Sequence, residues 1–76
     1  MPHVIIKMVT GRSEQQKAKL AEDITKTVMA GAKYAEDAVS VSIEDIAPGD
    51  WIETVYKPDI AAKPKTLYKK PGYRPD

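Results

Sequence analysis

Hydrophobic residues first recur in a short stretch near the beginning of the chain. Within residues 3–9, Val4, Ile6 and Met8 share one parity, while Ile5 and Val9 share the other. Apolar side chains on both faces are typical of a strand that is covered on both sides. We therefore predict such a strand over residues 3–9, ended by the glycine at position 11.

The next stretch has the spacing of an amphipathic helix. Ser13 and Gln16 fit a capping box, in which Ser13 is the N-cap and Gln16 reaches back from the third helical position. The apolar residues that follow recur every three or four positions: Ala18, Leu20, Ala21, Ile24, Val28 and Met29. Charged residues take the opposite side, where Glu22 and Lys26 form a favourable pair. The pattern predicts a helix of about five turns, weakening at Gly31.

A second strand is predicted after the helix. Val39, Val41 and Ile43 alternate with polar residues, which is the period expected when one face of a strand is well buried. Strand, helix and strand in this order make a β-α-β unit with parallel strands. The predicted fold class is α/β (α+β), with one β-α-β protomer over about residues 2–46. One helix covers a single face of two strands, so the other face needs a partner.

The composition changes beyond residue 47. After the turn at residues 47–50 lie Trp51, three of the four tyrosines and four of the six prolines, the prolines at positions 58, 64, 71 and 75. Because proline interrupts helices, we predict short helical segments over residues 50–67, broken near Pro58 and Pro64, and an extended tail over residues 68–76. The chain is expected to form one domain, residues 1–76.

Size and charge restrict the classes of function. A chain of 76 residues without cysteine has no disulfides or thiolate ligands, and one histidine cannot build a zinc site. We expect no metal and no cofactor, and self-association is the remaining way to stabilise so small a core. The formal charge of +1 argues against nucleic-acid binding. The absence of a long apolar run predicts a cytoplasmic protein without membrane contact.

The most reactive candidate group is at position 2. A small residue after the initiator methionine is the usual condition for its removal, so Pro2 is expected to become a terminal secondary amine. An ordinary α-amino group titrates near pH ~8, and an apolar pocket or a neighbouring cation lowers that value toward neutrality, where a general base works best. If Met1 is retained, the nitrogen is an amide without basicity.

Pro2, the first strand, the Gly-Arg-Ser sequence at residues 11–13 and the helix opening at residues 14–17 resemble the 4-oxalocrotonate tautomerase family, without gaps to about Trp51. The resemblance implies that Pro2 is the general base. It also implies that Arg12 binds the substrate carboxylate and draws electron density, and that Trp51 helps form the apolar pocket. The family's β-α-β protomers assemble into dimers or hexamers.

Two departures from the family pattern refine this expectation. Ser40 replaces the second arginine that hexameric members carry on the second strand, and it is a candidate donor to the substrate. Residues 52–56 replace a glycine-rich hairpin, and a longer tail follows. These features resemble the dimeric branch, which implies a homo-oligomer, a dimer rather than a hexamer. They also imply action on enols of small 2-keto acids, such as phenylenolpyruvate or 2-hydroxymuconate-like compounds.

The leading hypothesis is therefore an isomerase, a proline-based keto–enol tautomerase. Two alternatives stay open. A hydratase or dehalogenase of unsaturated acids would need a carboxylate to activate water, for which the chain offers no clear candidate. A non-catalytic oligomeric binding module would result if the amine of Pro2 were blocked. His3 either tunes the neighbouring base or is a surface residue, and no role is assigned to Lys69, Lys70 or Tyr73.

Overall fold

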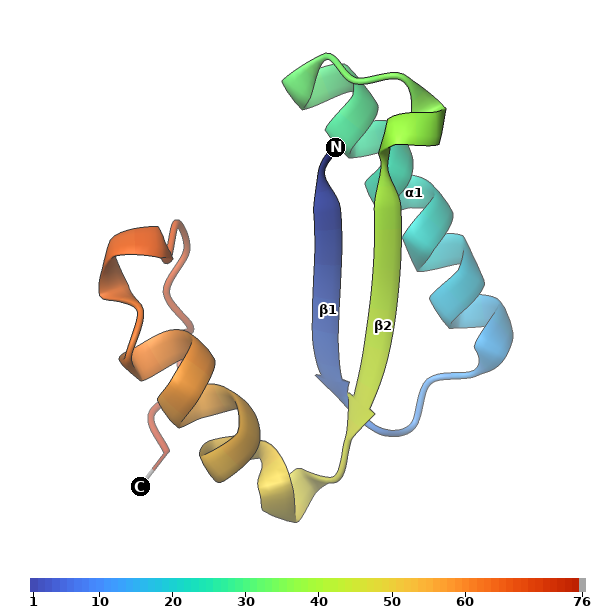
Figure 1. Ribbon diagram of the computed structural model, residues 1–76. Helices are drawn as coiled ribbons and strands as arrows, with labels where there is room; N and C mark the ends of the chain where they lie inside the picture. The colour runs from blue at the N-terminus through green and yellow to red at the C-terminus, as the bar shows by residue number, and fades with distance from the viewer. Residues whose placement is uncertain (76) are drawn as a thin grey trace.

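The computed structural model describes residues 1–75 and contains one two-stranded parallel sheet. Strand β1 (His3–Val9) leads into helix α1 (Glu14–Ala32), and strand β2 (Ser40–Ile46) follows after a short 3-10 turn, η1 (Glu36–Ala38). The strands pair in register from His3 with Ser40 to Val9 with Ile46. Figure 1 shows the two strands side by side with α1 along one face. The predicted β-α-β unit is confirmed.

Helix α1 begins and ends as local chemistry dictates. The amide of Gln16 donates to Ser13 Oγ at 3.1 Å, and the amide of Ser13 donates to Gln16 Oε1 at 2.9 Å, which completes the predicted capping box. The helix continues through Gly31 and ends at Lys33, whose left-handed φ of 63° stops it. The predicted weakening at Gly31 therefore lies one residue before the last helical residue, Ala32.

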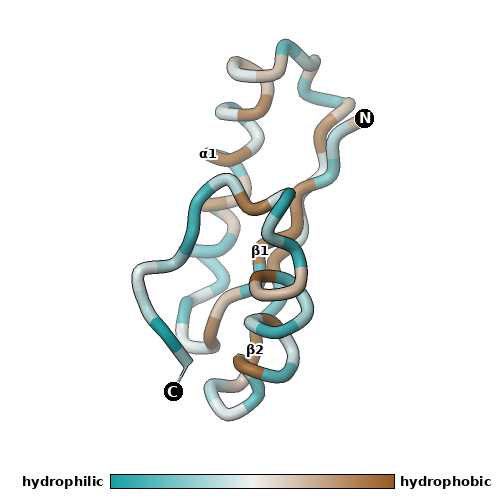
Figure 2. The backbone as a smooth tube through the Cα atoms, turned by 90° about the vertical axis from the view of Figure 1, so that its left-hand side faces the viewer, coloured by the Kyte–Doolittle hydropathy of each residue, from teal (hydrophilic) through white to brown (hydrophobic). Residues whose placement is uncertain are grey.

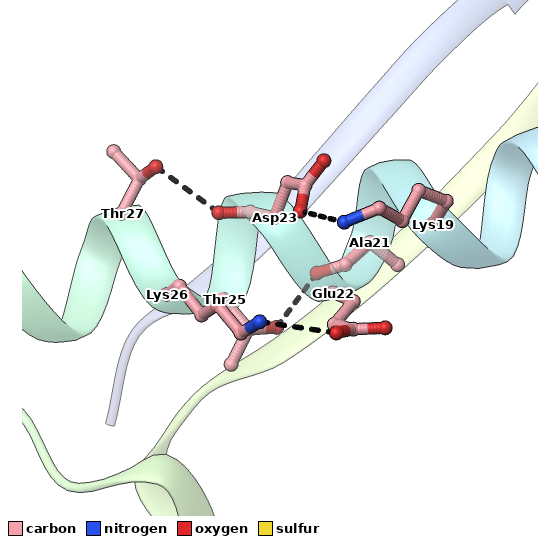
Figure 3. A network of polar contacts seen from close by, with 7 residues as sticks. All are labelled: Lys19, Ala21, Glu22, Asp23, Thr25, Lys26 and Thr27. Atoms are coloured by element: carbon pink, nitrogen blue, oxygen red, sulfur yellow. Dashed lines mark hydrogen bonds and ion pairs between the residues drawn. The ribbon is translucent and has the colours of Figure 1, made fainter.

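The outer side of α1 is held together by pairs one turn apart (Figure 3). Lys26 Nζ lies 3.1 Å from Glu22 Oε1, as the sequence predicts, and Lys19 Nζ lies 2.7 Å from Asp23 Oδ1. Thr25 donates its hydroxyl to the carbonyl of Ala21. Exposed pairs of this kind contribute only about 0.2–0.5 kcal/mol each, so packing of the opposite face determines where the helix sits.

The sheet has one well-covered face and one that is partly open. Lys17 of α1 forms an ion pair with Asp45 of β2, which identifies the face of β2 that α1 covers. On the other face, Ile5 is 53% exposed and Val9 is 39% exposed. Within residues 1–75, Val55 is the only buried hydrophobic residue, with 5% of its surface exposed. The prediction that both faces of the first strand are covered is therefore wrong for the isolated chain, because the second layer only partly reaches β1.

That second layer is the C-terminal segment. It consists of the short turn η2 (Pro48–Asp50), the π-helix η3 (Ile52–Ala61) and the short turn η4 (Pro64–Thr66). Figure 1 shows the segment on the side of β1 away from α1, and Figure 2, turned by 90°, shows it in front of the strands. Among residues 1–75, no helix combines the length and apolarity needed to cross a membrane.

The predicted break at Pro58 is not observed. Pro58 lies inside η3, which runs on to Ala61, and the next helical piece begins at Pro64. In an α-helix the proline ring collides with the carbonyl four residues earlier, whereas the wider i→i+5 turns of a π-helix move that carbonyl away from the ring. Residues 67–75 form no helix or strand. The tail predicted for residues 68–76 ends at Asp76, which lies outside the described residues.

One ion pair joins η3 to the open face of the sheet. Lys7 Nζ lies 2.6 Å from Asp59 Oδ2, and the two side chains are only 28% and 30% exposed. The hydrogen bond from Lys7 lowers the pKa of Asp59 below its ordinary value of 3.8, and the hydrogen bond to Asp59 raises the pKa of Lys7 above 10.5. The pair therefore ties the two layers together over a wide pH range.

Replacing Asp59 with asparagine should reduce the pH dependence of stability at the acid end. Because the pKa of Asp59 is lower in the folded chain than in the unfolded one, its contribution is complete above pH 3.8 and is lost as the pH falls through the lowered pKa. Urea unfolding between pH 2 and 6 measures this effect. The matched control is Asp23→Asn, which removes an exposed pair within α1. Equal slopes in both variants would contradict the prediction.

Candidate functional site

The candidate base lies at the exposed beginning of β1. The carbonyl of Pro2 accepts a hydrogen bond of 3.2 Å from the amide of Ser40, so β2 fixes the backbone of Pro2. Beside it, His3 Nδ1 lies 2.7 Å from Ser40 Oγ. Met1 is fully exposed, and Pro2 itself is half-buried. The structure thus brings together three residues that the sequence singled out separately: Pro2, His3 and Ser40.

The candidate carboxylate-binding group lies at the other end of the same strand. Gly11 adopts a φ of 130°, a conformation that suits glycine, and turns the chain out of β1 toward the N-cap Ser13. Arg12 stands between them and borders a hollow of about 200 Å³ together with Gln16 and Lys17. A cation here opposes the dipole of α1 by about 0.3–1 kcal/mol, so local helix stability does not explain this arginine.

Trp51 is the N-cap residue of η3 and is half-buried. It borders the groove between η3 and β1, a hollow of about 440 Å³ that Ile5, Lys7 and Val55 also line. Its indole Nε1 donates to Tyr73 Oη at 2.9 Å, and the ring of Tyr73 contacts that of Tyr56 with centroids 5.9 Å apart at 51°. Trp51, the aromatic residue predicted to line the pocket, is therefore hydrogen-bonded through its indole nitrogen to the C-terminal tail.

Sequence reasoning assigned no role to Tyr73, and no periodicity could have linked it to Trp51. The two residues are 22 positions apart and belong to a region without regular strands. The only available signal was the concentration of aromatic residues after position 50. Buried or half-buried indole groups usually find a hydrogen-bond acceptor, but the sequence offered several acceptors.

Replacing Tyr73 with phenylalanine should change the environment of Trp51 without unfolding the chain. The ring stays on Tyr56, while the indole loses its acceptor, a loss of about 0.5–1.5 kcal/mol at most for a partly exposed bond. Because Trp51 is the chain's only tryptophan, its fluorescence emission reports the change directly. Tyr68→Phe is the control, since Tyr68 is fully exposed. Identical spectra for both variants would show that the bond does not hold Trp51 in solution.

Pro2 and Arg12 are too far apart in one chain to act on one small molecule. They flank the seven residues of β1, which at about 3.3 Å per residue separate them by roughly 20 Å. Figure 1 shows the chain beginning at one end of β1 and turning toward α1 at the other. Trp51 follows the C-terminal end of β2, where Ile46 pairs with Val9, so it lies on the side of Arg12. The candidate residues therefore lie in two groups at opposite ends of β1.

Comparison with known proteins places this chain among enzymes. The family model described as "Tautomerase enzyme" matches residues 2–55, which is more than half of the chain. The chain belongs to the tautomerase family. The match begins at Pro2, and the predicted family is confirmed. The protein is accordingly an isomerase of the keto–enol tautomerase class.

Two curated relatives of this tautomerase match almost its full length. A protein of Xylella fastidiosa (strain 9a5c) described as "Probable tautomerase" is 42% identical over 73 residues, covering 96% of this chain and 89% of the relative. "Tautomerase PptA" of Escherichia coli is 38% identical over 74 residues, covering 96% and 97%. Because the alignments include most of the residues beyond position 55, these relatives share the C-terminal segment that the family model leaves out.

Solved structures match the tautomerase fold. A 4-oxalocrotonate tautomerase isozyme from Methylibium petroleiphilum is 30% identical with a TM-score of 0.64, over 66% of this chain and 81% of that one. YwhB, described as a homologue of 4-oxalocrotonate tautomerase, is 35% identical with a TM-score of 0.59, over 60% and 75%. Both likenesses support the β-α-β architecture that the sequence predicts.

Proposed function

We propose that this protein ketonises enols of small 2-keto acids, such as phenylenolpyruvate, with the amine of Pro2 as general base after removal of Met1. The observation that carries the proposal is the position of Pro2. It stands at an exposed strand end, its backbone is fixed by Ser40, and the match to the tautomerase family begins at this residue. A 2-hydroxymuconate-like enol is a second substrate of the same class.

The reaction moves one proton and changes no oxidation state. The neutral amine takes the proton from the enol hydroxyl, the oxygen becomes a carbonyl, and the electrons of the C=C bond accept the proton from the ammonium group at carbon. One base performs both transfers. Positioned bases contribute about 10²–10⁴-fold to such reactions, provided that a donor stabilises the oxygen while it is charged.

Arg12 is the proposed carboxylate ligand, and a neighbouring copy supplies it. A guanidinium binds a carboxylate through two parallel hydrogen bonds. Because roughly 20 Å separates it from Pro2 of its own chain, a complete site needs Pro2 from one copy and Arg12 from another. We propose a homodimer with two such sites. The exposed Ile5 and Val9 on the open face of the sheet are apolar surface that a second copy can bury.

Trp51 provides the proposed apolar wall. It lies at the same end of the sheet as Arg12, so both reach Pro2 of the partner copy together. An indole face suits the aryl or vinyl group of the proposed substrates. Tyr73 holds the polar edge of the indole at 2.9 Å, which keeps the ring in one orientation.

The test is the ketonisation of phenylenolpyruvate, followed by its ultraviolet absorbance, with protein whose intact mass shows that Met1 is absent. The proposal expects turnover well above the uncatalysed rate. The same protein with Met1 retained is the matched control, since its Pro2 nitrogen is an amide. Equal, near-background rates in both samples would defeat the proposal and favour the non-catalytic binding module.

A further inference from the structure

His3 and Ser40 form a side-chain pair at the first position of the sheet, immediately after the proposed base in the chain. They are register partners on adjacent strands, and His3 Nδ1 lies 2.7 Å from Ser40 Oγ. Both residues are exposed, and they lie on the sheet face opposite α1. His3 follows Pro2 directly, so their Cα atoms are about 3.8 Å apart, although neighbouring side chains along a strand point to opposite faces. His3 is also the only histidine of the chain.

Ser40 fixes two groups at once. Its amide donates to the carbonyl of Pro2 at 3.2 Å, and its hydroxyl lies within hydrogen-bond distance of the ring of His3. When the hydroxyl donates to Nδ1, the imidazole is neutral and carries its proton on Nε2. Because Nδ1 accepts the hydrogen bond from Ser40, the N–H group at Nε2 remains available to donate to another molecule. In that tautomer, one serine contacts both the backbone carbonyl of Pro2 and a ring that can donate from Nε2.

We propose that His3 donates Nε2–H to the substrate oxygen that becomes negatively charged during proton transfer, and that Ser40 is the residue that positions it. This inference rests on the proposed function. A donor is required at that oxygen, and Arg12 of the same chain is roughly 20 Å from Pro2. If Arg12 of the partner copy binds the substrate carboxylate, the charged enol oxygen needs a hydrogen-bond donor of its own. His3 is the candidate for that donor. The proton that moves belongs to Pro2 throughout, and His3 keeps its own.

Steady-state kinetics with phenylenolpyruvate test the two roles separately. His3→Phe keeps an aromatic ring without a donor, and its kcat should fall about 100-fold with a smaller change in KM, the loss typical of one oxyanion donor. His3→Gln restores an N–H near the position of Nε2 and should recover part of kcat. Ser40→Ala should lower kcat about 5- to 10-fold, the effect of losing one orienting hydrogen bond. Ser40→Thr, which keeps the hydroxyl, should approach the parent.

Ser42→Ala is the matched control, because Ser42 pairs with Ile5 on the same sheet face, one pair further along. Nitrogen-15 NMR of the single histidine gives an independent readout. The parent should show an unprotonated Nδ1 and a protonated Nε2, and Ser40→Ala should shift that balance. Addition of trans-cinnamate, a planar aryl carboxylate that cannot tautomerise, should shift the Nε2 signal in the parent.

The outcomes separate this inference from the proposed function. A Met-free parent without turnover defeats the proposed function, and the role of His3 with it. If the parent is active and the His3→Phe variant has the same kcat, the role proposed for His3 is wrong and the proposed function stands. A loss of kcat in Ser42→Ala equal to that in Ser40→Ala would also overturn it, because the effect would then follow from strand packing.

Discussion

Replacing Pro2 with alanine should lower kcat/KM for phenylenolpyruvate about 100-fold, at the lower end of the range for a positioned base. Alanine still permits removal of Met1, so the variant retains a terminal amine. That amine is primary and sits on a backbone without a ring, so it is less well oriented toward the enol. The measurement is the ketonisation rate of parent and variant, each with its mass confirmed.

The backbone contact that fixes residue 2 provides the control for this comparison. The hydrogen bond from the amide of Ser40 to the carbonyl of residue 2 does not involve the proline ring. Thermal unfolding of parent and Pro2→Ala should therefore agree closely. A variant that loses activity and also unfolds much earlier would show that Pro2 acts through the fold, and unchanged activity would exclude it as the base.

Removing Arg12 should be the second large effect. Arg12→Ala should reduce kcat/KM at least 10- to 100-fold, because the loss of even one hydrogen bond to a charged group costs about 1.5–3 kcal/mol. Most of the loss should appear in KM, since the carboxylate is charged both in the substrate and in the transition state. Arg74→Ala removes the chain's other arginine, at the end of the tail, and should leave both constants near those of the parent.

The two variants together test where the site lies. If Pro2 and Arg12 come from different copies, a dimer of one Pro2→Ala chain and one Arg12→Ala chain contains one intact site and one doubly defective site. Unfolding and refolding an equal mixture should then restore about a quarter of the parent activity, since about half of the dimers are mixed and each has one good site of two. If the refolded mixture is no more active than the two variants assayed separately and added, Pro2 and Arg12 of each site come from the same copy.

The sequence predicted the parts of the fold that depend on local chemistry. The capping box of Ser13 and Gln16 and the apolar spacing behind it defined α1, and the alternation of Val39, Val41 and Ile43 defined β2. The break at Pro58 was predicted wrongly, because the rule that applies to an α-helix does not hold for the wider turns of η3.

The candidate residues were proposed from the sequence, but their arrangement in space could not be. Pro2 and Arg12 were identified from the chain order that resembles the tautomerase family, but chain order does not say that β1 holds them at opposite ends. The contacts of Trp51 with Tyr73 and of His3 with Ser40 join residues 22 and 37 positions apart. Such contacts depend on how elements meet in space, and neither strand nor helix periodicity contains that information.

The length of β1 has a consequence for how this protein can evolve. In the proposed dimer, each copy of β1 carries the base of one site and the arginine of the other, so one strand length sets the spacing of both sites. Insertion of a single residue would also turn every following side chain to the opposite face. The part of the C-terminal segment after residue 55 lies outside this constraint. Insertions and deletions among related proteins should therefore accumulate after residue 55, whereas the seven residues of β1 keep their number.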